Sequence, residues 1–361
     1  MNAEIPFLVC CSRAEERTME KRIEIRDLWK IYGPNVAQFV ARNSNPTEEA
    51  VREAALFPAV QRVNLDVYKG EILVIMGLSG SGKSTLMRCV NRLIEPEFGS
   101  VKVDGQNLEH ASPQVLRDIR RKKMGMVFQN FALLPYSTVL ENVAMPLKIR
   151  GEAKADRLQR ALEMIALVGL AGKEGHFPSE LSGGQQQRVG IARSLAVNPE
   201  IWFLDEPFSA LDPLIRREMQ DEFLRLQDHF HKTILFVTHD FDEAVRVGNR
   251  IVIMRDGKLV QVGSAEELVL NPADEYVSTF TKYVNRTKVI TTRSLMNKDP
   301  DMAVNGDAIP SDMLVSDAFV RLKGDVSAVR PVVDAKGVRI GSISQSALME
   351  QIIEMMNQAE I

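Results

Sequence analysis

The stretch Gly-Leu-Ser-Gly-Ser-Gly-Lys-Ser-Thr at residues 77–85 decides the fold of this chain. An apolar, β-branched run at 72–76 precedes it and predicts a buried strand. Apolar residues at helical spacing over 86–94 follow it and predict a helix packed on a sheet. A strand, a glycine-rich turn and a helix thus follow one another in the order that a phosphate-binding loop requires.

The residues of this loop suit the binding of a triphosphate. Gly77, Gly80 and Gly82 let the backbone turn sharply and point its amide N–H groups inward, and the helix N-terminus adds a partial positive charge. Lys83 can reach the β- and γ-phosphates, and the Ser84 hydroxyl can be a ligand of Mg²⁺. A plain glycine-rich turn is the alternative, but the spacing G-x-x-x-x-G-K-S between a strand and a helix argues against it. The sequence therefore predicts a nucleoside triphosphate site.

Length and composition restrict the class of protein. The 361 residues suffice for one large α/β domain and a smaller unit. The net charge is −3 and the charged residues are well mixed, which indicates no nucleic-acid-binding surface. The cysteines Cys10, Cys11 and Cys89 cannot form a disulfide framework and indicate a reducing compartment. We expect Cys89 to be a small buried apolar residue.

The N-terminal segment does not read as a targeting signal. No apolar run reaches the roughly 18 residues that span a bilayer. The apolar run at 5–11 is short, lacks preceding basic residues and is followed by charges, so it is a poor signal peptide; lipidation of Cys10 is an alternative. We expect residues 1–20 to be a disordered extension, or the product of an upstream start codon, on a soluble cytosolic chain.

Strand and helix patterns alternate over most of the chain, and this alternation implies a mostly parallel sheet. Residues 21–32 alternate apolar and charged side chains, which suits an edge strand. Residues 33–58 look like an insertion with two helical stretches separated by an Asn-Pro pair. The other strands are predicted at 60–67, 101–105, 124–128, 201–204 and 233–237, the helices at 157–168, 186–197 and 213–230, and a hairpin within 250–262.

The remaining segments complete the predicted architecture. Residues 130–190 lack strand character and suggest a helical subdomain inserted into the α/β core. Residues 265–284 have a helical pattern. The last part, 285–361, is predicted to be a small α+β unit with an irregular start, two strands around a Lys-Gly turn and a closing helix.

An acidic pair marks a second part of the expected site. The strand at 201–204 ends in Asp205 and Glu206, and open α/β sheets place their sites at the carboxyl ends of their strands. Asp205 can hold Mg²⁺ directly or through water, and Glu206 can polarise an attacking water. A solvated loop is the alternative reading of this pair.

The stretch Leu-Ser-Gly-Gly-Gln at 181–185 offers a second cradle for phosphate. It precedes a helix, so Ser182 and the glycine amides lie at a positive helix end. One chain already has a phosphate loop, and a second cradle makes sense if it closes on the nucleotide of another copy. Taken alone, the pentapeptide fits a plain helix cap equally well.

Together these motifs resemble the ABC ATPases over residues 23–262. The matching order is the phosphate loop, Gln129 after a strand, 181–185, Asp205-Glu206, 209–212 and His239. The resemblance implies an ABC ATPase domain over 21–284 with a parallel-sheet core, an antiparallel β subdomain and the inserted helical subdomain. It also implies a head-to-tail homodimer that encloses two molecules of ATP with Mg²⁺.

The resemblance also implies a role for each matching residue. Tyr32 would stack on adenine, Asp212 would link the two sites, and His239 would stabilise the γ-phosphate or orient water, although a merely packed histidine is the alternative. Glu206, His239 and Gln129 would form the catalytic set, and Ser84, Gln129 and Asp205 the metal set. The phosphates would be bound by Gly77, Ser79, Gly80, Gly82, Lys83, Ser84 and Thr85 of one copy and by Ser182, Gly183, Gly184 and Gln185 of the other.

Further segments resemble the glycine betaine/proline (quaternary amine) uptake ATPases. They are the insertion after Tyr32 and the residues 76–84, 91–96, 120–129 and 209–216. In addition, residues 128–136 resemble the segment that engages membrane subunits in importers. Their apolar character fits a groove for a short helix of a partner, and core packing is the alternative. The family implies permease subunits, a separate binding protein that holds the cation in an aromatic cage, no nucleic acid, and a peripheral place at the cytoplasmic face of the cell membrane.

The last unit resembles one cystathionine-β-synthase (CBS) module, through 330–334, Gly337 and 340–344. Members of the family often carry two such modules, but only one is recognisable here. Contact between two copies in the dimer is the expected role, and regulation by salt or nucleotide stays open. The identity of the amine also stays open among glycine betaine, choline, proline betaine, carnitine and trimethylamine N-oxide.

Other functions are less consistent with the sequence. A soluble ABC ATPase of DNA repair or translation would add coiled-coil, zinc or strongly basic elements, which the sequence lacks. An importer ATPase for another solute, such as an amino acid, is a closer alternative. A regulatory ATP-binding module without turnover is the third, and Glu206 and His239 argue against it.

Overall fold

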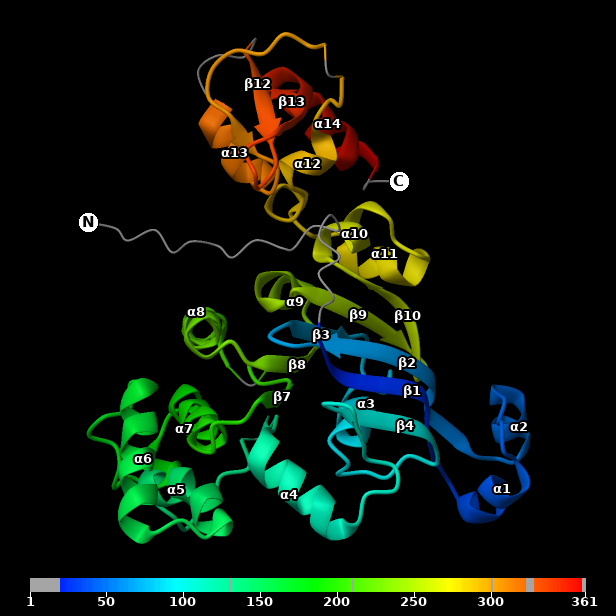
Figure 1. Cartoon of the computed structure of the whole chain (residues 1–361), viewed down its shortest axis with the longest axis vertical. Coiled ribbons are helices and arrows are strands. Elements are labelled where there is room, and N and C mark those ends of the chain that lie inside the picture. Colours follow the sequence, from blue (N-terminus) through cyan, green and yellow to red (C-terminus); the bar gives the residue numbers. More distant parts are fainter. Residues whose placement is uncertain (1–19, 130, 210, 300, 323–327, 359–361) are drawn as a thin grey trace. The chain divides into compact units, whose positions relative to one another are not determined.

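The computed structural model describes residues 20–129, 131–209, 211–299, 301–322 and 328–358 (Figure 1). The expected N-terminal extension therefore lies outside the described residues, apart from Glu20, as do Asn130 and Ala210. The boundary between two compact units falls at Val262 and Gly263. No helix among these residues is long and apolar enough to cross a membrane.

A six-stranded sheet in the order β10-β9-β3-β8-β7-β6 forms the core of the first unit. Strands β6, β7, β8, β3 and β9 run parallel, as the sequence pattern predicts. The predicted hairpin is also present, because Asp256 and Gly257 both have positive φ and return the chain from β9 into β10. The strands are β3 Ile72–Met76, β6 Met124–Val127, β7 Ile201–Asp205, β8 Thr233–Thr238, β9 Arg250–Arg255 and β10 Lys258–Gly263.

A second sheet has the order β2-β1-β4-β5, with β1 Lys21–Tyr32, β2 Phe57–Tyr68, β4 Phe98–Val103 and β5 Gln106–Asn107. β1 lies between β2 and β4, so the prediction of an edge strand is wrong. The alternation arises because Ile23 and Ile25 are fully buried on one face, whereas Arg26 on the other face pairs with Asp66 of β2 at 2.6 Å. A charged, half-solvated face gives the same pattern as an edge.

Most helices of the first unit lie in the predicted segments, with some shifts at their ends, and the helices Pro113–Lys123 and Phe241–Val247 lie outside those segments. In Figure 1, α5, α6 and α7 lie together beside the six-stranded sheet, and α7 is joined to β7 by the hydrogen bond that Trp202 Nε1 donates to Ser194 Oγ at 2.9 Å. α7 begins three residues earlier than the pattern over 186–197, because Ser182 caps it. The helices are α1 Val36–Arg42, α2 Glu48–Glu53, α3 Lys83–Val90, α4 Pro113–Lys123, α5 Val139–Arg150, α6 Lys154–Leu167, the 3₁₀ helix Pro178–Glu180, α7 Gly183–Ala196, α8 Pro213–Phe230 and α9 Phe241–Val247.

The second unit begins with two short helices. α10 (Ala265–Leu270) and α11 (Glu275–Thr281) lie within the segment 265–284 that has a helical pattern, and the Asn-Pro pair after α10 separates them because proline removes a backbone donor. The Glu266 carboxylate accepts a hydrogen bond from the backbone N–H of Thr291 at 2.6 Å. This bond ties α10 to the chain beyond residue 284, which accounts for a unit boundary earlier than the predicted one.

A three-stranded sheet, β11-β12-β13, holds the rest of this unit together. β11 is parallel to β12, and β12 is antiparallel to β13. The chain thus follows a β-α-β-β-α order, and the likeness to a CBS module remains a prediction. The elements are the 3₁₀ helix Arg286–Lys288, α12 Thr292–Leu295, β11 Ile309–Pro310, α13 Val315–Leu322, β12 Val329–Val333, β13 Arg339–Ser344 and α14 Gln345–Gln358.

Cys89 of α3 is fully buried, as predicted, and burial raises the pKa of its thiol to about 12. Because the thiolate is the reactive form, we expect iodoacetamide at pH 8.5 to modify Cys89 at least about 100-fold more slowly in the native protein than in guanidinium. Peptide mass spectrometry separates Cys89 from Cys10 and Cys11. Rapid modification of native Cys89 would contradict the prediction.

The same pKa shift has a consequence for stability. The folded protein keeps the Cys89 proton to a higher pH than the unfolded chain, in which the thiol has its ordinary pKa of 9.0. Stability is therefore unaffected by this group below pH 9.0 and falls as the pH rises from 9.0 toward about 12.

Candidate functional site

The loop between β3 and α3 depends on glycine at two positions. Gly77 and Gly82 have φ values of +151° and +99°. A Cβ on Gly77 would lie 2.2 Å from the carbonyl oxygen of Met254, and one on Gly82 would lie 2.4 Å from that of Ala59. No other residue type fits without moving the backbone. The sequence forms a tight cradle of main-chain atoms here, which suits a phosphate group.

Lys83 lies at the base of this cradle. Its buried ammonium group donates hydrogen bonds to the carbonyl oxygens of Gly77 and Leu78, at 2.9 and 3.0 Å. Burial lowers the pKa of Lys83, and the charges of Glu206 and Asp205 oppose that shift. An ammonium group has three N–H donors, so one donor remains for a phosphate oxygen.

Ser84 and Asp205 place two oxygen donors next to each other. The Ser84 hydroxyl donates to Oδ1 of Asp205 at 2.7 Å, and Arg88 Nη2 donates to Oδ2 at 3.3 Å. Asp205 ends β7 and is 1% exposed. A hydroxyl and a carboxylate are ligands that Mg²⁺ prefers, and phosphates complete its coordination. The described residues hold no cluster of His, Cys, Asp and Glu that would bind a metal alone, so the fit is to a metal–phosphate pair.

Three strand ends converge on the Glu206 carboxylate. Gln129 follows β6, Glu206 follows β7 and His239 follows β8, and these strands are neighbours in the sheet. Gln129 Nε2 donates to Glu206 Oε2 at 3.2 Å, and His239 Nδ1 lies 3.3 Å from the same oxygen. The carboxylate is thus held between two polar groups, in an arrangement that could orient a water molecule.

The turn after β7 fixes the backbone of Glu206. Glu206 has a φ of +47°, in the left-handed region, and its N–H donates to the carbonyl of Val237 at 3.0 Å. Its own carbonyl accepts from the Ser209 hydroxyl at 3.0 Å. Phe208 is 1% exposed, and its ring centroid lies 5.8 Å from that of Phe236. These contacts maintain a backbone conformation that a residue with a Cβ adopts only under tertiary constraint.

The stretch 181–185 contains the N-terminus of α7, where side chains cap two backbone N–H groups. Ser182 Oγ accepts from the backbone N–H of Gln185 at 3.3 Å, and the Gln185 side chain accepts from the N–H of Ser182 at 3.1 Å. Asp212 caps α8 in a similar way, accepting from the N–H groups of Leu214 and Ile215. Both caps are exposed.

These two helix ends lie side by side. A Cβ on Gly184 would lie 2.8 Å from Ile215 Cγ2, and one on Gly183 would lie 3.9 Å from Leu211 Cδ2. Two partial positive charges therefore meet at one exposed place. Neither cap, however, shares a hydrogen bond with the cluster around Glu206 in the described part of this single chain.

The other predicted residues flank the site. Tyr32 ends β1, is 40% exposed, and has Lys30 Nζ at 5.0 Å from its ring centroid. Ser79 and Gly80 are exposed in the loop, and Thr85 is half-buried in the first turn of α3. Arg88 is not among the predicted site residues. Its position one helical turn after Ser84, on the same face, was the available signal.

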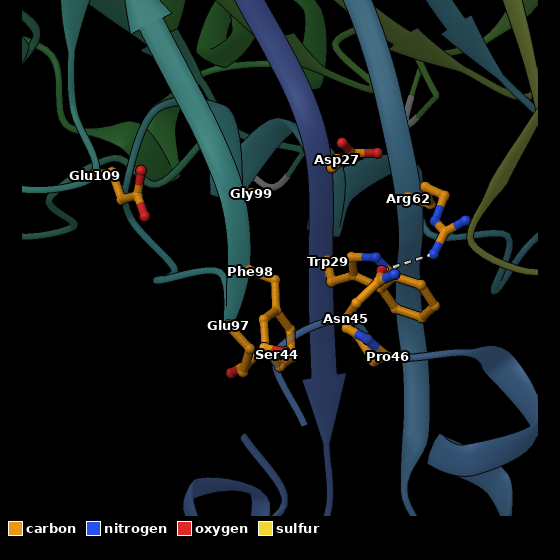
Figure 2. Close-up of a pocket in the computed structure, with 10 residues that line it drawn as sticks. All are labelled: Asp27, Trp29, Ser44, Asn45, Pro46, Arg62, Glu97, Phe98, Gly99 and Glu109. Carbon is orange, nitrogen blue, oxygen red and sulfur yellow. Dashed lines mark hydrogen bonds between the residues drawn. The ribbon is translucent and has the colours of Figure 1, made fainter. Parts of the chain in front are cut away.

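A cavity of about 540 Å³ lies elsewhere, between β1, β4 and the segment before α2 (Figure 2). It contains none of the predicted site residues. One of its carboxylates, Glu97, is already paired with Lys30 at 2.6 Å. The lining residues are Asp27, Trp29, Ser44, Asn45, Pro46, Arg62, Glu97, Phe98, Gly99 and Glu109.

Comparison with known proteins gives close relatives. The ABC transporter family model matches residues 60–209. The trimethylamine N-oxide transport system ATP-binding protein of Pelagibacter ubique is 47% identical over 91% of this chain and 97% of its own length, and that of Ruegeria pomeroyi is 49% identical over 92% and 97%. The glycine betaine transport ATP-binding protein of Bacillus subtilis is 49% identical over 77% of this chain and 67% of its own length.

A solved structure agrees with the fold. The dimeric structure of a post-hydrolysis state of the ATP-binding cassette MJ0796, bound to ADP and phosphate, is 35% identical to this chain, with a TM-score of 0.57. The match covers 67% of this chain and 98% of that cassette.

Proposed function

The chain belongs to the ABC transporter family, among the ATP-binding subunits of quaternary amine and trimethylamine N-oxide transport systems, and from this we propose that it hydrolyses ATP to drive the import of a small methylated amine. The main support for this proposal is the similarity to two relatives. It extends along more than nine-tenths of this chain and over 97% of the length of each relative.

We assign the nucleotide to residues 77–85. The loop amides, the remaining N–H donor of Lys83 and the N-terminus of α3 would bind the phosphates, with the exposed Tyr32 ring stacked on adenine. Ser84, Asp205 and Gln129 would hold Mg²⁺. Bound Mg²⁺ neutralises charge on the β- and γ-phosphates. The bond between Ser84 and Asp205 supports this assignment, because it already gathers two of the oxygen donors.

We assign the hydrolytic step to Glu206. Its carboxylate would take a proton from the water that attacks the γ-phosphate, so that ATP and water give ADP and phosphate. Gln129 and His239, both beside Oε2 of this carboxylate, would orient the water and the γ-phosphate. The fixed backbone of Glu206 supports the role, because general-base catalysis requires a positioned group.

We assign the second helix-end cradle to the nucleotide of another copy. In the described part of the chain, no hydrogen bond joins residues 182–185 to the cluster around Glu206, and these residues lie beside the Asp212 cap. Two exposed helix N-termini attract an anion. A head-to-tail pair would let them close over the partner copy's γ-phosphate, with Asp212 linking the two sites.

We place the dimer beneath integral membrane permease subunits, at the cytoplasmic face of the membrane. In the segment 131–136, the large apolar side chains Tyr136 and Leu134 are 93% and 39% exposed. Exposed apolar side chains on a helical subdomain suit a groove for a partner's short helix. A separate substrate-binding protein would deliver the amine.

Trimethylamine N-oxide is the substrate that we favour. The relatives for this compound match 91% and 92% of the chain, which includes the second unit. The relatives for glycine betaine, carnitine and proline betaine match 76–78% of it. We expect the binding protein and the permease subunits to hold the amine, so the experiment requires the whole transporter.

Uptake by the transporter in liposomes tests the proposal. The subunit is reconstituted with its permease and binding protein, and the entry of labelled trimethylamine N-oxide, glycine betaine, choline, carnitine and proline betaine is measured with ATP inside. We expect uptake of trimethylamine N-oxide at least about tenfold above the level without ATP. A preference for glycine betaine would overturn the substrate only, whereas no uptake of any methylated amine would overturn the transport function.

A further inference from the structure

Arg193 of α7 holds the loop that carries Gln129. Its guanidinium donates to two consecutive main-chain carbonyls, from Nη2 to Phe131 and from Nη1 to Ala132, both at 2.6 Å. Phe131 and Ala132 follow Gln129 by two and three residues. The other end of α7 is capped by Ser182, about three helical turns earlier. One rigid helix thus connects the Ser182 cradle to the Gln129 loop.

The loop that Arg193 holds is conformationally strained. Phe131 and Ala132 have φ values of +57° and +47°, and consecutive left-handed residues with a Cβ are uncommon. The N–H of Phe131 donates to the carbonyl of Phe128 at 2.9 Å, so the residues on either side of Gln129 are hydrogen-bonded to each other. Such a backbone persists only where its surroundings impose it. The two hydrogen bonds from Arg193 supply part of that constraint.

The charged guanidinium of Arg193 forms no ion pair within the described residues. Burial lowers the pKa of this guanidinium. Partial burial of a charge without a carboxylate partner costs free energy. The two hydrogen bonds to carbonyl groups offset part of this cost. The planar guanidinium presents donors from two separate nitrogen atoms, Nη1 and Nη2, at a fixed spacing, whereas a lysine ammonium would have to reach both carbonyl oxygens from a single nitrogen atom.

We infer that Arg193 is a positioning residue that couples the two nucleotide sites of the dimer. The inference rests on the proposed function, in which Ser182 closes on the partner's ATP and Gln129 acts on this chain's own ATP. A shift of α7 on closure would pass through Arg193 to Phe131 and Ala132. It would thereby set the 3.2 Å hydrogen bond between Gln129 and Glu206.

Arg193→Lys tests this coupling, with Arg188→Lys as the matched control. Arg188 lies on the same helix and also donates to a main-chain carbonyl, but this carbonyl belongs to Val168, at 3.3 Å, and not to the loop that carries Gln129. The measurements are kcat for ATP, the Mg²⁺ concentration for half-maximal activity, equilibrium ATP binding and Tm, all on the reconstituted transporter or the full chain. Arg193→Gln replaces the lysine variant if the latter does not fold.

We expect Arg193→Lys to lower kcat about tenfold and to raise the Mg²⁺ requirement, with ATP binding and Tm within the range of Arg188→Lys. A kcat within about twofold of Arg188→Lys would overturn the inference, and so would an equal loss of kcat, ATP binding and Tm, which marks a purely structural role. Turnover by the unaltered protein in the same assay tests the proposed function separately, because the inference depends on the ratio of the two variants.

Discussion

Glu206→Gln is expected to lower the steady-state rate of ATP hydrolysis at least about 100-fold while ATP binding is retained. The amide has nearly the shape of the carboxylate but cannot accept a proton from water. Its oxygen can still accept the hydrogen bond that Gln129 Nε2 donates at 3.2 Å. The cradle formed by residues 77–85 is unchanged, so the nucleotide remains bound.

The same variant should accumulate an ATP-bound dimer. In the proposed dimer, hydrolysis would release two copies held together by shared nucleotide, and the loss of hydrolysis would trap them. Size-exclusion chromatography with ATP and Mg²⁺ should show a dimer for Glu206→Gln and mostly a monomer without nucleotide.

A control distinguishes this result from a general effect of removing a carboxylate. Glu163 on α6 pairs with Arg160 at the surface, at 3.1 Å, and Glu163→Gln should hydrolyse ATP at the rate of the unaltered protein. If Glu206→Gln turned over ATP at nearly that rate, Glu206 would not be the general base. If the variant failed to bind ATP, the role of Glu206 would be structural.

The parts of the site that are local in sequence could be predicted from sequence. The cradle is one such part, because strand, glycine turn and helix lie within about twenty-five residues and their patterns are distinct. The parallel sheet follows from the alternation of strands and helices. Ser182 and Asp212 could be predicted as helix caps, since the residues that they contact are two and three positions away.

The convergence on Glu206 could be predicted only in part. Sequence shows that Gln129, Glu206 and His239 each follow a strand, but it does not show that β6, β7 and β8 are neighbours. Helical crossovers leave the order of parallel strands open, and Gln129 and Glu206 are 77 residues apart. The family resemblance, rather than periodicity, brought these residues into one site.

The hydrogen-bond acceptors of two arginine side chains could not be predicted from the sequence. Arg88 and Arg193 act through atoms distant along the chain, Asp205 in one case and main-chain carbonyls in the other. Every residue has a main-chain carbonyl, so the residue type does not identify an acceptor of this kind. No sequence pattern could therefore predict the contacts of Arg193 with Phe131 and Ala132. The edge-strand error in β1 has a related cause, because alternation reports solvent exposure and not the number of neighbouring strands.

Mixing two inactive variants is expected to restore hydrolysis, and the restored activity tests the shared site directly. Lys83→Ala removes the ammonium group from the cradle. Ser182→Arg places a bulky charge at the exposed cap of α7 and leaves the phosphate loop at residues 77–85 intact. Each variant alone should lose at least about 100-fold in hydrolysis rate, because every site in either homodimer has one damaged half.

The mixed dimer differs from both homodimers, because one of its two sites combines the intact Lys83 of one copy with the intact Ser182 of the other. Random exchange at equal concentrations makes about half of the dimers mixed, so up to about a quarter of the sites are complete. Hydrolysis measured after mixing should rise toward that fraction. Lys83→Ala mixed with the double variant Lys83→Ala/Ser182→Arg is the control, because no copy there has an intact cradle, and it should stay inactive. If Ser182 instead closed on the nucleotide of its own chain, no combination would contain a complete site, and the absence of recovery would refute the shared-site dimer.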